Sequence, residues 1–152
     1  MLLANVNNVL LIIYLFNTHR LFMYFTNWTL LVTVAYLAVA IKACNTTASY
    51  SLLAAHHILF EVSLIMNIVV MVVYWSCLHD QSLLEVADDK WKIANCYLAH
   101  LVPGFSVMVN FGITDVVLRP SHVKGFPVIA ILYAVQNYYE TKKLGRPLYF
   151  FM

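Results

Sequence analysis

The sequence has few charged residues. Asp, Glu, Lys and Arg together make up 11% of its 152 residues, against about 25% in an ordinary soluble domain. Glycine and proline occur only 4 times each, which excludes a collagen-like chain and, with so little charge, a disordered one. The 3 cysteines are odd in number and form no CxxC pair, which argues against a disulfide scaffold.

The chain is instead rich in apolar side chains. Hydrophobic residues make up 62% of it, and one domain of this size cannot hide that much apolar surface from water. A water-soluble enzyme is therefore a poor interpretation. The net charge of +2 is not gathered into a basic face, so we expect no nucleic-acid partner. The composition predicts one integral membrane domain over residues 1–152.

Long apolar runs divide the chain into membrane segments. A helix needs about 20 mostly apolar residues to cross a bilayer, and runs near this length cover 21–41, 58–78 and 93–118. A shorter run at 2–16 is expected either to cross or to lie in the interface. Another at 126–139 can cross if flanking lysines snorkel. The pattern predicts an all-α fold, a polytopic transmembrane helical bundle with four to five segments.

Two polar residues inside these segments suggest chemistry. Thr26 and His100 lie near the starts of the second and fourth segments, which alternation of the loops places at the same membrane surface. A threonine hydroxyl becomes a nucleophile when a nearby base takes its proton, and histidine suits that role. A non-catalytic hydrogen bond is the more common role of such a histidine. Thr29 and Thr33, on the same helix face as Thr26, are expected to bond backbone or a neighbouring helix.

Titratable residues also gather at the opposite surface, namely Glu61, Asp115, Arg119 and His122. We predict that they form a charge-compensated structural network, in which Asp115 and Arg119 pair one helical turn apart. A metal site built from His56, His57, Glu61 and His122 is the alternative, but no motif of the HExxH kind is present. The sequence therefore predicts no metal site and no cofactor.

Several short motifs, taken in order, are similar to those of one known family. They are Met23–Trp28, Val72–Trp75, Asn95–Pro103, Arg119–His122, Tyr133 and Gly145–Tyr149. Each motif has low specificity, but their order and spacing together resemble the androgen-induced-gene family of multipass membrane proteins. This family includes the androgen-dependent TFPI-regulating protein and is related to the rolling stone proteins. The resemblance covers the chain from about Leu21 to the C-terminus.

The resemblance implies an intramembrane threonine hydrolase that cleaves fatty acid esters of hydroxy fatty acids. The family's nucleophile matches Thr26 and its histidine matches His100. Its Arg-x-Ser-His element matches Arg119, Ser121 and His122. Membrane lipids are the partners that this reading implies.

The remaining parts of such a site are less well defined by the sequence. An ester hydrolase needs a donor for the oxyanion, and Asn27 and Asn95 are the candidates for that or another supporting role. Cys96 stands four residues before His100, where the family has an asparagine. The chain is also shorter than the family pattern at both ends, so we expect either an open lipid pocket or a partner that closes it.

A second interpretation follows from that shortening. The chain would be a non-catalytic structural subunit of a large membrane complex, such as a mitochondrial inner-membrane assembly, with protein partners covering its apolar surface. A transporter is a weaker option, because the sequence has no repeated halves. The sequence predicts an integral membrane location without separating the mitochondrial inner membrane from the endoplasmic reticulum or plasma membrane.

Overall fold

The structure, a computed structural model, describes residues 1–16, 22–147 and 149. These residues form six α-helices and confirm the all-α prediction. The helices are α1 (Leu2–Phe16), α3 (Phe25–Asn45), α4 (Tyr50–Val73), α5 (His79–Glu85), α6 (Lys90–Ile113) and α7 (Gly125–Leu144). A π-helical turn, η1 (Tyr74–Leu78), joins α4 to α5, and a 3-10 turn, η2 (His122–Lys124), precedes α7.

Three of the helical segments are long and apolar enough to cross a membrane. They are α3 with 21 residues, α4 continued by η1 with 29, and α6 with 24. At about 1.5 Å of rise per residue, each reaches or exceeds the roughly 30 Å of a hydrocarbon core. They correspond to the predicted segments 21–41, 58–78 and 93–118, although Leu21 lies outside the described residues.

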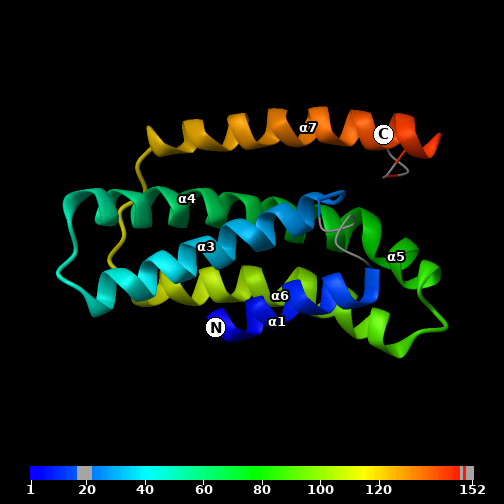
Figure 1. The fold of residues 1–152 in the computed structure, drawn as a ribbon, viewed down its shortest axis with the longest axis horizontal. Helices are drawn as coiled ribbons and strands as arrows, with labels where there is room; N and C mark the ends of the chain where they lie inside the picture. Colours follow the sequence, from blue (N-terminus) through cyan, green and yellow to red (C-terminus); the bar gives the residue numbers. More distant parts are fainter. Residues whose placement is uncertain (17–21, 148, 150–152) are drawn as a thin grey trace.

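The long helices lie side by side along one direction (Figure 1). α3 and α4 pack together along their length, and α6 packs against both. α7 runs beside α4 on the side away from α6 (Figure 1). The loops at one end of the bundle join α3 to α4 and α6 to α7, so that residues far apart in sequence meet there (Figure 1).

The first predicted segment, 2–16, forms α1 and packs against α3 and α6. Of the three asparagines that interrupt its apolar run, Asn5 and Asn8 face the bundle and Asn7 is exposed. Asn5 is fully buried, and its side-chain amide donates to the Ser106 hydroxyl at 3.0 Å. The Asn8 amide donates to the Leu98 carbonyl at 3.1 Å. These hydrogen bonds attach α1 to α6, because an unpaired amide in an apolar interior is costly.

A buried polar network joins α3 to α4. The Thr33 hydroxyl lies 2.9 Å from the Ser63 hydroxyl, and the Asn67 amide donates to Thr33 Oγ1 at 2.9 Å. All three side chains are almost completely buried. Tyr36 and Phe60 pack beside this network in the main apolar cluster. Thr33 also donates to the Thr29 carbonyl at 2.8 Å, so the structure confirms the prediction that Thr33 bonds backbone or a neighbouring helix, and shows that it does both.

Two helices are longer than their apolar runs. α4 begins at Tyr50 because Ser49 caps it, with its hydroxyl accepting the Leu52 N–H at 3.3 Å. α7 continues through its basic last turn to Leu144. It ends there because Gly145 adopts a left-handed φ of 67°, the usual conformation just past a helix C-terminus.

One predicted helix is too long. The apolar run 93–118 suggested a helix to Leu118, but α6 ends at Ile113, Thr114 is extended, and 115–119 has no regular secondary structure. The prediction that Asp115 and Arg119 pair one helical turn apart is therefore wrong. Pro120 disfavours a helical conformation at the residue before it, and the irregular segment after α6 brings the Arg119 backbone to Glu61.

Candidate functional site

The two residues singled out for chemistry are in contact. Thr26 lies in the first turn of α3, and His100 lies on α6. Thr26 Oγ1 is 3.2 Å from His100 Nε2, although the two residues are 74 positions apart in sequence. This is the separation that a hydroxyl and its general base require. The structure therefore brings together the pair that the sequence placed at one membrane surface.

A backbone carbonyl determines which nitrogen of His100 faces the threonine. His100 Nδ1 lies 2.6 Å from the Cys96 carbonyl oxygen. A carbonyl only accepts hydrogen bonds, so Nδ1 carries the proton of the neutral imidazole. Nε2 then presents its lone pair to the Thr26 hydroxyl. Because Cys96 acts through its backbone, the side chain at this position has no part in the bond.

The ring of Tyr74 packs against one face of the His100 imidazole. Tyr74 stacks on His100 with ring centroids 3.4 Å apart and an interplanar angle of 9°. Tyr74 opens the π-helical turn η1, a feature that is frequent at functional sites. Its hydroxyl lies 3.4 Å from His79 Nδ1. The sequence assigned Tyr74 no role, because no local sequence pattern predicts where a π-helical turn places a side chain.

An apolar cavity of about 260 Å³ opens beside Thr26. It lies between α3, α4 and α7, and the side chains lining it include Phe25, Val70, Val73, Phe126 and Ala130. Its volume is near the lower end of small-molecule pockets, which run from about 300 to 1,000 Å³. Thr26 is one of the few lining residues with a polar side-chain group, so an apolar chain in the cavity would lie next to the Thr26 side chain.

Two tyrosines from the C-terminal part of the chain also line the cavity. The Tyr149 hydroxyl accepts the Phe25 N–H at 3.1 Å, one of the N–H groups that a helix N-terminus leaves without an intrahelical acceptor. The Tyr133 hydroxyl lies 3.2 Å from both the Tyr149 hydroxyl and the Met23 carbonyl. Burial raises the pKa of Tyr149, so its phenol stays protonated. The sequence named both tyrosines in motifs but gave them no role in a site.

The two asparagines considered as oxyanion donors are buried. Asn27 follows Thr26 on α3, and Asn95 lies near the start of α6. Of the described residues, those that line the cavity do not include either asparagine. The role of Asn27 and Asn95 as supporting groups stays a prediction.

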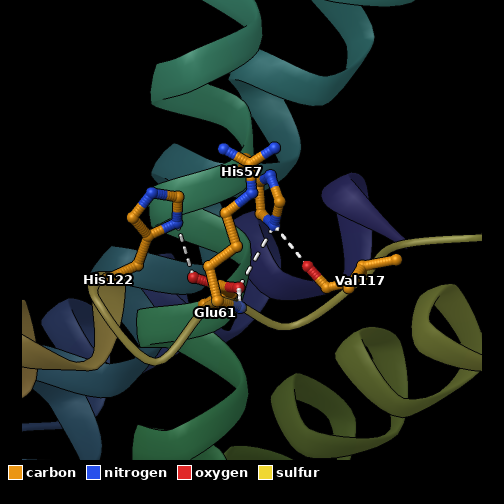
Figure 2. Close-up of polar contacts among 5 residues, drawn as sticks. His57, Glu61, Val117 and His122 are labelled. Atoms are coloured by element: carbon orange, nitrogen blue, oxygen red, sulfur yellow. Dashed lines mark hydrogen bonds and ion pairs between the residues drawn. The ribbon is translucent and has the colours of Figure 1, made fainter.

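The second cluster is built on α4 and on the connection from α6 to α7, and Figure 2 shows its side chains. Glu61, on α4, is 2% exposed, and its carboxylate faces two histidines. Its Oε1 is 3.1 Å from His57 Nε2, and its Oε2 is 2.7 Å from His122 Nδ1. Arg119 contributes its backbone N–H, which donates to Glu61 Oε1. Glu61 and His122 therefore meet as predicted, with His57 as an additional member.

Two residues considered for this cluster lie outside it. Asp115 is exposed in the irregular segment after α6. His56 turns toward α3, where its ring centroid lies 5.4 Å from that of Tyr36. The i,i+4 spacing of His57 and Glu61 on a helix was a usable signal, but nothing local indicated that His122 would join them.

Comparison of the chain with protein-family models, curated proteins and solved structures finds no match. The function is therefore inferred from the residues of this chain.

Proposed function

We propose that this protein is an intramembrane hydrolase of long-chain lipid esters, with Thr26 as the nucleophile and His100 as the general base. The observation that carries the proposal is the 3.2 Å contact between Thr26 Oγ1 and His100 Nε2. The bond from His100 Nδ1 to the Cys96 carbonyl supports it, because that bond leaves Nε2 able to accept a proton. The motif resemblance to the androgen-induced-gene family points to the same chemistry.

The proposed reaction has two steps. His100 Nε2 takes the Thr26 proton as Oγ1 attacks the ester carbonyl, and the ester C–O bond then breaks. The proton passes to the departing alcohol, and the acyl group remains on Thr26. Water then attacks the acyl-threonine, again with His100 as base, and releases the fatty acid with Thr26 restored.

The cavity supports an apolar acyl group as the substrate. Val70 and Val73 of α4 and Phe126 of α7 line it beside the nucleophile, and these side chains offer contacts to hydrocarbon only. Fatty acid esters of hydroxy fatty acids are the substrate class that the motif resemblance implies. We further propose that α1 and α7 complete the bundle as additional membrane segments, next to the three that are long and apolar enough.

The test is ester hydrolysis by the full chain purified in lipid nanodiscs. Thr26→Val keeps the side-chain shape and removes the hydroxyl, so we expect it to abolish turnover. His100→Gln removes the base and should lower kcat by about 10²–10⁴-fold. Thr26→Ser restores a hydroxyl and should recover part of the activity. Mass spectrometry of protein quenched during turnover should find the acyl group on Thr26.

Thr29→Val is the matched control. Thr29 lies one turn further along α3, and its hydroxyl donates to the Phe25 carbonyl of its own helix at 3.0 Å, so this variant should keep wild-type turnover. The proposal is wrong if Thr26→Val and His100→Gln, folded as judged by gel filtration, hydrolyse the ester at the wild-type rate.

The second candidate function is a non-catalytic subunit of a membrane complex. It is supported by the apolar outer face of α7, where Ile131 is 64% and Leu132 55% exposed. Such a face fits either lipid or a neighbouring subunit. Migration of the native protein as a stoichiometric part of a large complex in mild detergent, with no ester hydrolysis, would favour this function.

A further inference from the structure

We propose that His57, Glu61 and His122 bind a divalent transition-metal ion, with Zn²⁺ as the ion that the ligands fit best. Each residue offers one ligand atom, and these atoms lie within 4.8 Å of one another. The site lies at the end of the bundle opposite to the end that holds Thr26 and His100, so the proposal does not depend on the hydrolase activity.

The three side chains converge from two parts of the chain (Figure 2). His57 and Glu61 are one turn apart on α4, and His122 comes from the 3-10 turn η2. The two imidazole rings are nearly perpendicular, at 88°, with centroids 5.1 Å apart. Both rings direct a nitrogen at the carboxylate of Glu61 (Figure 2). His57 Nε2 also lies 3.0 Å from the Val117 carbonyl oxygen, which only accepts hydrogen bonds, so Nε2 carries a proton that a bound ion would displace.

The contact between Glu61 and His122 lacks the geometry of a hydrogen bond. Glu61 Oε2 and His122 Nδ1 are only 2.7 Å apart, yet each is buried without a hydrogen-bond partner of acceptable geometry. Buried polar atoms without such partners are rare and call for an explanation. Two lone-pair atoms that approach a common point are what a metal ion would join.

The charge of Glu61 also supports a bound metal ion. Glu61 is 2% exposed, and within the described part of the chain its ion pairs involve only His57 and His122, not a lysine or arginine. A buried carboxylate needs a compensating positive charge. A divalent ion held by two neutral histidines supplies it without requiring that either imidazole be protonated.

The ligand types select the class of ion. Two imidazoles and one carboxylate exclude Ca²⁺ and Mg²⁺, which prefer oxygen ligands. Zn²⁺ is bound by sets of two His and one Glu, with water in the fourth position. The Arg119 N–H donates to Glu61 Oε1, which is the kind of outer hydrogen bond that orients a metal-binding carboxylate.

The site is accessible to an ion from solution. The side chains of His57 and His122 are 23% and 21% exposed, so their ligand atoms lie just below the surface. A bound ion would tie α4 to the connection between α6 and α7. It would therefore stabilise the packing of α7, and Zn²⁺ should raise the thermal unfolding midpoint of the full chain.

The test measures metal content directly. The full chain, stripped with a chelator in detergent, is incubated with Zn²⁺ or Fe²⁺ separately, passed over a desalting column and analysed by mass spectrometry for metals. We expect about one Zn²⁺ per chain and a higher unfolding midpoint with Zn²⁺. Co²⁺ in place of Zn²⁺ should give the visible absorption of a low-symmetry, four- or five-coordinate site.

The variants separate the site from adventitious binding. His122→Ala changes a short 3-10 turn, and Glu61→Gln keeps the side-chain shape, so both should fold while losing at least nine-tenths of the bound Zn²⁺. His56→Ala, next to His57 in sequence but facing Tyr36, should bind like the wild type, and so should Thr26→Val. The proposal fails if the wild type retains no Zn²⁺, or if His122→Ala and Glu61→Gln retain as much as the wild type. Stoichiometric Fe²⁺ with little Zn²⁺ would overturn the choice of ion.

Discussion

The Tyr74 ring lies flat on the imidazole of His100, with centroids 3.4 Å apart and an interplanar angle of 9°. The ring thereby prevents rotation of the imidazole away from Thr26, whose hydroxyl lies 3.2 Å from His100 Nε2. Tyr74 is a positioning residue in the proposed reaction, since it acts through the base.

This relationship predicts how substitutions at Tyr74 affect catalysis. Tyr74→Leu removes the stacking surface, and we expect it to lower kcat by about tenfold to a hundredfold, because small misplacements of a catalytic group are costly. KM should change little. Tyr74→Phe keeps the ring and should recover most of kcat. Steady-state ester hydrolysis checks this prediction, and an unchanged kcat in the leucine variant would contradict it.

The polar network between α3 and α4 predicts a stability effect. Thr33→Val removes the contacts of its hydroxyl with the buried Ser63 hydroxyl and Asn67 amide, which still bond to each other, so it should lower the free energy of unfolding by about 0.5–1.5 kcal/mol. Reversible unfolding in mixed detergent micelles measures it. Thr46→Val is the control, because Thr46 is exposed and should change stability by less than about 0.5 kcal/mol.

The contact between α6 and α4 predicts a steric effect at a glycine. A Cβ atom added at Gly104 would overlap the Met71 thioether, so Gly104→Val should destabilise the protein by about 1–3 kcal/mol. Met71→Ala in the same chain should recover part of this loss. Gly112→Val is the control, since nothing lies within 4 Å of a Cβ there. Equal unfolding midpoints for the two valine variants would show that the contact at Gly104 is unimportant.

The cap of α6 predicts a pH dependence. The Lys92 N–H, with smaller help from the Lys92 side chain and the Trp91 N–H, lowers the pKa of the Asp89 carboxyl below its usual 3.8. A carboxyl whose pKa is lower in the folded state stabilises that state above its unfolded pKa, and the effect is lost as pH falls through the folded pKa. Asp89→Ala should therefore lower the unfolding midpoint at pH 7.

The difference between Asp89→Ala and the wild type should shrink below about pH 4. Circular dichroism melts at several pH values follow it. Asp88→Ala changes the neighbouring exposed carboxyl and should melt like the wild type. If Asp89→Ala and the wild type melted alike at pH 7 as well, the cap would have no measurable effect.

Much of the fold follows from the pattern of apolar residues. The predicted run 58–78 lies within α4 and η1, and the run 2–16 coincides with α1. The ends of the helices were harder to predict from the sequence, because each end depends on single residues. The structure shows that Ser49 caps α4 and that Gly145 terminates α7, and the apolar runs indicated neither end. They did not indicate the end of α6 at Ile113 either, since the residues after it are as apolar as those before it.

The candidate sites, too, could be predicted from the sequence only in part. Alternation of helix direction alone placed Thr26 and His100 at one end of the bundle, because antiparallel helices return to the same surface after every second crossing. It did not supply Tyr74, whose position on His100 depends on the π-turn η1. It did not supply Tyr149 either, which reaches Phe25 from 124 residues away.

The sequence by itself determined that the chain is a set of apolar helices and which end of the bundle holds each polar residue. Those properties come from composition and from the period of the helix, and both are local. Only the tertiary structure decided which side chains touch. His122 meets Glu61 across 61 residues because the chain leaves α6 early. The Thr26 hydroxyl meets a lone pair of His100 because the Cys96 carbonyl binds the other nitrogen of that imidazole. Such contacts depend on the packing of several helices at once, which no local pattern encodes.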